Sequence, residues 1–196
     1  MVEYFKYKSY EEYLEIQRKK ALLTKTRTSR ACGERRRRYL YKRMSKTGVK
    51  GSTILCIGAR DDSEILFFKE RGYQTDGIDL YSTDNIIECD MSKIYEHPYF
   101  QEKKYDIVFS NESLEHCLDI DGFIKGLNLV CKRYFVCMCP VGDAGLWDCA
   151  RHSFMEHMDD IEHNKKDLEE CFSEFNVILN EIHKEGHRMF FILEKK

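Results

Sequence analysis

The chain of 196 residues carries 32 Lys and Arg against 34 Asp and Glu, and 42% of its residues are hydrophobic. This length fits one full domain with a small extension, and the composition is too apolar for a wholly disordered chain. With only 2 prolines and 11 glycines, collagen-like and linker-rich architectures are excluded. No apolar run approaches the ~18 residues of a membrane span, and the N-terminal sequence lacks the apolar core of a secretory signal.

Nine cysteines are an odd number for a sequence without a signal peptide, so we expect reduced thiols and a cytoplasmic location. Four potential metal ligands lie close together in the sequence: Cys149, His152, His157 and His163. Their spacing matches no zinc pattern with paired ligands, and we expect no metal site. Cys137 and Cys139 should point to the same face of a strand, toward a helix-covered core.

Charge divides the chain into two parts. Residues 1–50 carry 16 Lys and Arg against 5 Asp and Glu, whereas residues 51–196 carry 16 against 29. The division predicts a basic helical N-terminal extension over 1–50 and a main domain over 51–196. The densest charge is the run Arg35, Arg36, Arg37 and Arg38. Two interpretations of this run stay open: a solvated helix docked on the acidic domain, or a patch for phosphates such as those of RNA.

Two helices are expected in the extension. Ser9 followed by Glu12 forms a capping box for a helix over 9–23. A break over 24–33, with Gly33 as a stop, should precede a second helix that ends at Gly48. Tyr39, Leu40 and Met44 would be the apolar contacts of that second helix.

From Thr53 onward, short apolar runs alternate with helical patterns. Strands are expected at 53–58, 73–80, 85–91, 105–111, 133–142, 175–183 and 187–195. Helical segments are expected at 60–73, 93–100, 119–132 and 165–172. The order predicts an α/β fold: a Rossmann-like, mostly parallel seven-stranded sheet with helices on both faces and a C-terminal antiparallel hairpin.

Ligands of such sheets bind at the carboxyl ends of the strands, so the residues there are the candidates for function. Gly58 would let a ligand approach the backbone, or would only serve a tight turn. Asp79 lies 21 residues after Gly58, the spacing of a carboxylate that accepts hydrogen bonds from ribose hydroxyls. Asp90 could accept from the amine of a base or begin a helix. Residues 110–112 lie at the end of the fourth strand.

Four stretches resemble class I S-adenosylmethionine-dependent methyltransferases of the broad type 11 group: ILCIGARDDSE, GYQTDGIDL, ECDM and YDIVFSNESLEHCLD. The resemblance covers roughly residues 52–139. It implies that the first loop faces the methionine part of the cofactor, that Asp79 binds the ribose and that Asp90 binds the adenine. The implied cofactor-binding set is Gly58, Ala59, Arg60, Glu64, Asp79, Leu80, Asp90, Met91, Ser110, Asn111 and Glu112.

The chain departs from the family pattern at three places. Arg60 stands at the second glycine of Gly-x-Gly-x-Gly, and Cys56 stands where an acidic residue is usual. The residues 131–133 replace a Pro-Gly-Gly turn before the fifth strand.

The implied function is methyl transfer from S-adenosylmethionine to a hydroxyl or amine of a small-molecule or sugar-type acceptor. Such an acceptor must lose a proton, and the candidate bases are His116, Glu112 and His152. The segment 140–158 is expected to be a substrate lid or a wall of the substrate pocket. Two alternatives remain: an RNA or cap methyltransferase that uses the arginine run on phosphates, or a degenerate, non-catalytic binding protein.

Overall fold

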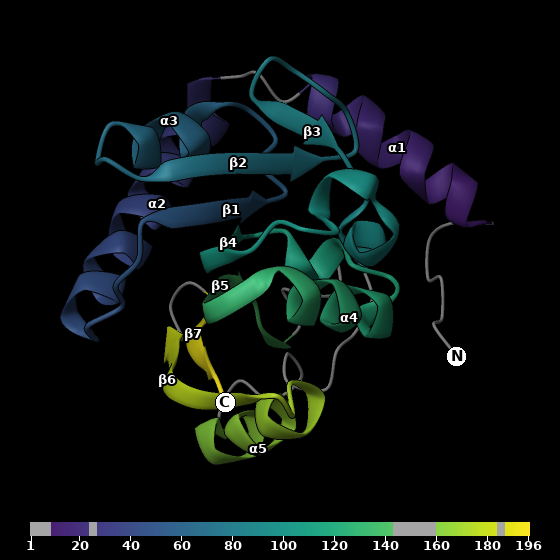
Figure 1. Ribbon diagram of the computed structural model, residues 1–196. Coiled ribbons are helices and arrows are strands. Elements are labelled where there is room, and N and C mark those ends of the chain that lie inside the picture. The colour runs from purple at the N-terminus through teal and green to yellow at the C-terminus, as the bar shows by residue number, and fades with distance from the viewer. Residues whose placement is uncertain (1–8, 24–26, 143–159, 184–186) are drawn as a thin grey trace.

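Seven strands form one sheet in the computed structural model, which describes residues 9–23, 27–142, 160–183 and 187–196 (Figure 1). The strands are β1 (Thr53–Ile57), β2 (Gln74–Asp79), β3 (Ile86–Glu88), β4 (Tyr105–Asn111), β5 (Cys131–Pro140), β6 (Phe175–His183) and β7 (Arg188–Lys195). Their order is β3-β2-β1-β4-β5-β7-β6. All neighbours are parallel except β7, which runs antiparallel to both β5 and β6. The predicted sheet and its closing hairpin are confirmed.

Strand β1 shows why a short apolar run sits at the centre of the sheet. Side chains alternate along a strand, and here Leu55 and Ile57 enter one core whereas Ile54 and Cys56 enter the other. Both faces of the strand are therefore buried, as a continuous apolar run indicates.

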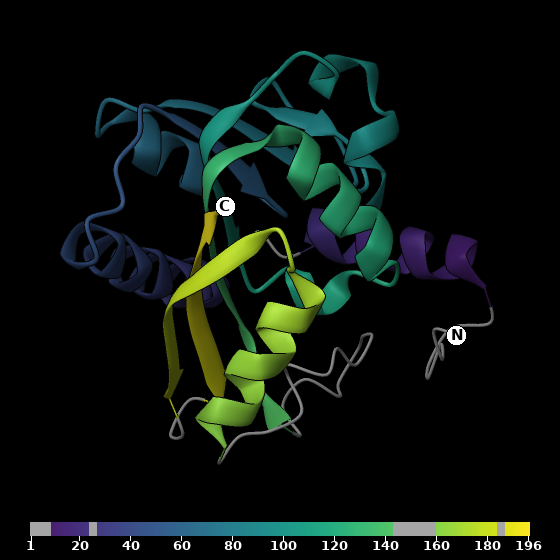
Figure 2. The same ribbon diagram turned by 60° about the horizontal axis from the view of Figure 1, so that its bottom comes forward.

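Helices cover the two faces of the sheet, as predicted. The helices α2 (Arg27–Lys46) and α3 (Ser63–Lys69) contribute to one core, and α4 (Ile120–Val130) and α5 (Ile161–Cys171) contribute to the other. Figure 2 shows α4 and α5 on the near side of the sheet and α2 behind it. Cys137 and Cys139 both lie in the core beneath α4 and α5, which confirms the expectation that they share a face.

The first helix, α1 (Tyr10–Leu23), begins where the capping box predicts. The Glu12 amide donates a hydrogen bond of 3.2 Å to Ser9 Oγ. In Figure 1 this helix lies beside the arrowheads of β1 and β2, at the carboxyl end of the sheet.

The predicted break over 24–33 is wrong in its second half. Helix α2 begins at Arg27 and runs through Gly33 to Lys46. A single glycine inside a helix costs only ~1 kcal/mol relative to alanine, and the helix-favouring residues that follow it outweigh that cost. Gly48 has φ of +78° just beyond the helix end, as the predicted stop requires.

Helix α2 is packed onto the sheet by its apolar face. Leu40 and Met44 are fully buried in the same core as Ile54 of β1 and Phe68 of α3. An ion pair of 2.8 Å between Arg43 and Glu181 ties its far end to β6. The basic helix is therefore docked on the acidic domain.

The start of β1 is held by one carboxylate. Asp106 accepts hydrogen bonds from the amides of Ser52 and Thr53, at 2.7 and 3.1 Å. Partial burial opposes ionisation of Asp106, but these bonds outweigh it and lower the pKa of Asp106 to about 2.

We expect Asp106 to contribute to acid sensitivity. A carboxyl with a lowered folded-state pKa stabilises the fold above its unfolded pKa, and this stability is lost as the pH falls from about 4 to about 2. Asp106→Asn should therefore flatten the pH dependence of the free energy of unfolding in that window, as measured by urea titration. The exposed Asp84→Asn should leave it unchanged. Identical profiles for both variants would contradict the assignment.

Candidate functional site

A cavity of about 250 Å³ opens at the carboxyl edge of β1, β2 and β4. Its walls come from the ends of these strands, the turn after β1, and the helices α1, α2 and α3. The sequence-predicted residues that line it are Gly58, Ala59, Arg60, Glu64, Asp79, Leu80, Met91, Asn111, Glu112 and His116.

Two predicted cofactor residues do not line this cavity. Asp90 Oδ1 accepts hydrogen bonds from the amide and hydroxyl of Ser92, at 2.9 and 2.8 Å, and so caps the helical turn Met91–Glu96. Ser110 is fully buried within β4. Adenine binding by Asp90 therefore stays a prediction. His152 and the predicted lid beyond residue 142 lie outside the described residues.

The conformation of the turn after β1 requires glycine at position 58. Gly58 has φ of +67°, and a Cβ atom there would overlap the side chain of Ser113. Arg60, at the position of a family glycine, also has positive φ, at +40°. The backbone of this turn thus has a left-handed conformation at a position that a non-glycine residue occupies.

Asp79 fastens this turn to the end of β2. Its Oδ2 accepts from the amide of Arg60 at 2.8 Å, and its Oδ1 accepts from the amide of Leu80 at 2.7 Å. Burial raises the pKa of Asp79, and the two amide hydrogen bonds oppose that rise. A carboxylate can accept about four hydrogen bonds, so Asp79 keeps capacity for a ligand hydroxyl.

Glu64 is a buried acid in the wall of the cavity. Its Oε1 accepts from Asn111 Nδ2 at 2.9 Å, whereas Oε2 is buried with no hydrogen-bond partner among the described residues. Burial raises the pKa of Glu64 to about 7, although Asn111 and Arg37 act in the opposite direction.

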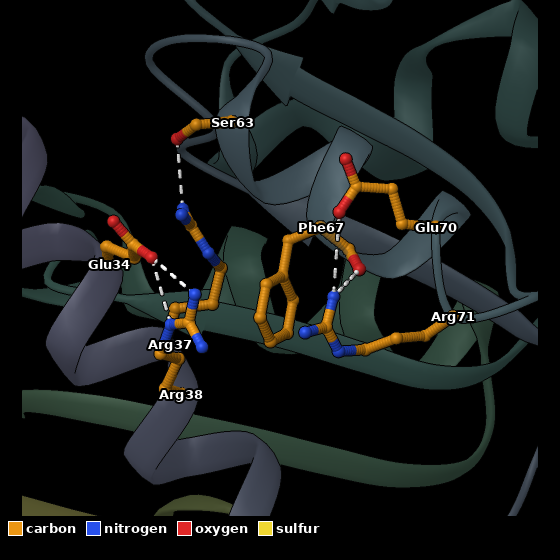
Figure 3. A network of polar contacts seen from close by, with 7 residues as sticks. All are labelled: Glu34, Arg37, Arg38, Ser63, Phe67, Glu70 and Arg71. Carbon is orange, nitrogen blue, oxygen red and sulfur yellow. Dashed lines mark hydrogen bonds and ion pairs between the residues drawn. The ribbon is translucent and has the colours of Figure 1, made fainter.

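Arg37 lines the cavity from α2, whereas the sequence suggested it only as part of a surface patch for phosphates. Its Nη1 donates to Ser63 Oγ at 2.9 Å, and its guanidinium lies 5.1 Å from the centre of the Phe67 ring (Figure 3). The sequence held a signal for this position, because Arg37 precedes Leu40 by three residues and Met44 by seven, the spacing of one helix face.

Glu112 joins two distant parts of the chain. Its Oε2 lies 3.0 Å from Arg36 Nη1 of α2, and its Oε1 lies 2.5 Å from Arg188 Nε of β7. The backbone of Glu112 has φ of +57°, a left-handed conformation that is uncommon for a residue other than glycine. Glu112 is thus arranged as an anchor, and neither arginine was predicted to contact it.

Two of the four consecutive arginines line the cavity, and the other two are exposed to solvent. Arg36 and Arg37 line the cavity, whereas Arg35 and Arg38 are exposed. Arg38 pairs with Glu34, at 2.6 Å, one turn earlier on the same helix (Figure 3).

Helix α1 covers the cavity and was also missed as part of the site. The Tyr13 hydroxyl donates to the carbonyl of His116. Arg18 donates to the carbonyl of Leu80 at 2.9 Å and pairs with Glu88 at 2.9 Å. The side chains of Tyr13 and Gln17 line the cavity.

The described part of the chain contains no group of three or more His, Cys, Asp or Glu side chains that could hold a metal ion. In the same ranges, no helix is long and apolar enough to cross a membrane. The cysteines whose side chains the structure describes are all free thiols.

No family model matches the chain, and no curated protein matches it. Among solved structures, 1,6-didemethyltoxoflavin-N1-methyltransferase from Burkholderia thailandensis, with bound 1,6-didemethyltoxoflavin and S-adenosylhomocysteine, is similar over 97% of this chain and 92% of its own. The identity is 14% and the TM-score is 0.67.

Two further solved structures extend this likeness. Magnesium protoporphyrin IX methyltransferase from Synechocystis PCC 6803, with bound S-adenosylhomocysteine, matches over 84% of this chain and 83% of its own, at 11% identity and a TM-score of 0.55. A S-adenosylmethionine-dependent methyltransferase from Aquifex aeolicus matches over 80% and 89%, at 12% identity and a TM-score of 0.54. With the strand order, these likenesses establish that the chain has the class I methyltransferase fold that its motifs predicted.

Proposed function

We propose that this chain binds S-adenosylmethionine in the cavity and transfers its methyl group to a small-molecule acceptor. The observation that carries the proposal is the pairing of the Gly58 turn with the Asp79 carboxylate at the edge of the sheet where ligands of such folds bind. The solved methyltransferase structures with bound S-adenosylhomocysteine support it.

The residues present fit this cofactor. Gly58 lines the cavity in a left-handed turn that a Cβ would push against Ser113, so the turn needs glycine to hold this part of the cavity wall. Asp79 has acceptor capacity left for ribose hydroxyls. The buried Glu64 Oε2 has no partner in the described ranges, so it can accept from a donor on the ligand.

The bound cofactor supplies a methyl group on a positively charged sulfur, so the task of the protein is to position the acceptor in line with it. A hydroxyl or amine acceptor must also lose a proton. We propose His116 for this step, because it lines the cavity. Glu112 faces two guanidinium groups, so we assign it to anchoring α2 and β7. A role for His152 stays a prediction.

A small acceptor is favoured over RNA by the arginine run. An RNA surface needs arginines that point outward to phosphates. Arg36 and Arg37 instead contact Glu112 and Ser63, and of the two exposed arginines Arg38 is paired with Glu34. The alternative of a non-catalytic binding protein predicts binding of S-adenosylmethionine without formation of S-adenosylhomocysteine for any acceptor.

Asp79→Asn should weaken the binding of S-adenosylhomocysteine by about tenfold, because a neutral amide replaces a charged acceptor for the ribose hydroxyls. Calorimetric titration measures this directly, and the melting temperature shows whether the variant is folded. Asp84→Asn, on the exposed loop after β2, serves as the control and should bind like the wild type. Unchanged affinity in the Asp79 variant would remove this residue from the site, and no binding by the wild type would overturn the proposed function.

A further inference from the structure

One end of the cavity holds a buried acid and a buried base that do not pair with each other in a direct ion pair. Glu64 and Arg37 keep only 7% and 6% of their surface exposed, and both line the cavity. Glu64 Oε2 and Arg37 Nε are each buried without a hydrogen-bond partner among the described residues. Burying a charged group without a hydrogen-bond partner costs free energy, and a ligand that supplies the partner removes this cost.

The surroundings leave one polar atom of each group without a partner among the described residues. Asn111 occupies only one oxygen of Glu64, and Ser63 occupies only one nitrogen of Arg37. The groups whose charge acts on Glu64 are Arg37 of α2, Asp61 of the turn after β1 and Asp79 of β2. Two of these three are negative, so the region around Glu64 attracts a cation.

A ligand group with one positive and one negative end would supply a hydrogen-bond donor for Glu64 and an acceptor for Arg37. An ammonium group offers three donors and suits a lone carboxylate oxygen. A guanidinium group offers a fork of donors that suits a carboxylate. The α-amino acid group carries an ammonium and a carboxylate on one carbon atom. Its ammonium would supply the missing donor for Glu64, and its carboxylate would supply the missing acceptor for Arg37.

We propose that Glu64 and Arg37 bind the α-amino acid group of the ligand, with Glu64 Oε2 accepting from its ammonium and Arg37 donating to its carboxylate. The proposal rests on the proposed function, in which this group is the methionine end of S-adenosylmethionine. Glu64 and Arg37 would then be the residues that make the site bind the full cofactor more tightly than adenosine compounds that lack the amino acid group.

The test compares S-adenosylhomocysteine with 5′-methylthioadenosine, which has the same nucleoside and sulfur but no amino acid group. Glu64→Gln should weaken S-adenosylhomocysteine binding by tenfold or more in calorimetric titration, and should change 5′-methylthioadenosine binding less than twofold. Arg37→Gln should show the same selective loss. Glu70→Gln, at the exposed end of α3, is the matched control and should leave both affinities unchanged.

A measurement on the wild type tests the same point without a substitution. Glu64 must be ionised to hold an ammonium, and its pKa is about 7 because burial opposes the charge. Affinity for S-adenosylhomocysteine should therefore fall about tenfold between pH 8 and pH 6, whereas affinity for 5′-methylthioadenosine should stay level. The Glu64→Gln variant should lose this pH dependence.

The outcomes separate the two proposals. If the wild type binds neither compound, the proposed function fails. If the wild type binds S-adenosylhomocysteine but the Glu64 variant loses affinity for both compounds equally, or for neither, the amino acid assignment is wrong. A loss confined to S-adenosylmethionine, with S-adenosylhomocysteine unaffected, would move the role of Glu64 from the ammonium to the charged sulfur and would also overturn the assignment.

Discussion

Gly58→Ala should abolish measurable binding of S-adenosylhomocysteine and lower the free energy of unfolding by about 2–4 kcal/mol. Two costs add at this position. Alanine disfavours the left-handed backbone at φ of +67°, and its methyl group would overlap the Ser113 side chain. The overlap involves Ser113 Cβ, so the backbone around it must shift, and the same turn carries the Arg60 amide that donates to Asp79 in the cavity wall.

Gly72→Ala separates the two costs. Gly72 also has positive φ, at +86°, but a Cβ there would meet nothing within 4 Å. We expect a loss of only about 1 kcal/mol and unchanged ligand affinity. Denaturant unfolding and calorimetric titration of both variants provide the comparison. Equal destabilisation of the two, with binding retained in each, would contradict the importance of the Gly58–Ser113 contact.

Leu40→Ala should lower the free energy of unfolding by about 2–5 kcal/mol, as large-to-small substitutions in protein cores do. Leu40 has no exposed surface and packs in the core shared by β1 and α3. The result would show that the basic extension is part of the cooperative fold and not a separately folding arm.

Leu66→Ala on α3 is the control for this substitution, because Leu66 is 48% exposed. Its truncation should cost about 0.5 kcal/mol or less in denaturant unfolding. If Leu40→Ala costs no more than Leu66→Ala, then α2 does not contribute to the stability of the domain, and the division of the chain near residue 50 would be a true domain boundary.

The order and type of the strands could be predicted because each strand carries its own signal. Strands β4 and β6 occupy the predicted ranges 105–111 and 175–183. Helix α2 differs, because Gly33 is a local break signal that neighbouring helix formers override. Propensity at one residue is weaker evidence than a pattern over a whole element.

The site was predictable only on the side built from the strand ends. Gly58 and Glu112 follow strands and Asp79 ends one, and the sheet topology brings such positions to one edge. Tyr13 and Arg37 lie on helices that precede the sheet, and their place over the cavity depends on how those helices dock. Docking depends on contacts between residues far apart in the sequence, which no local pattern records.

The anchor at Glu112 has a consequence for the order in which the protein becomes competent during synthesis. Arg36 lies near the beginning of the chain and Arg188 near its end, yet both close on this one carboxylate. Strand β7 must also enter between β5 and β6 before the sheet is complete. Residues 36, 112 and 188 must therefore all be synthesised before this contact can form, and a nascent chain stalled ahead of residue 188 should lack it.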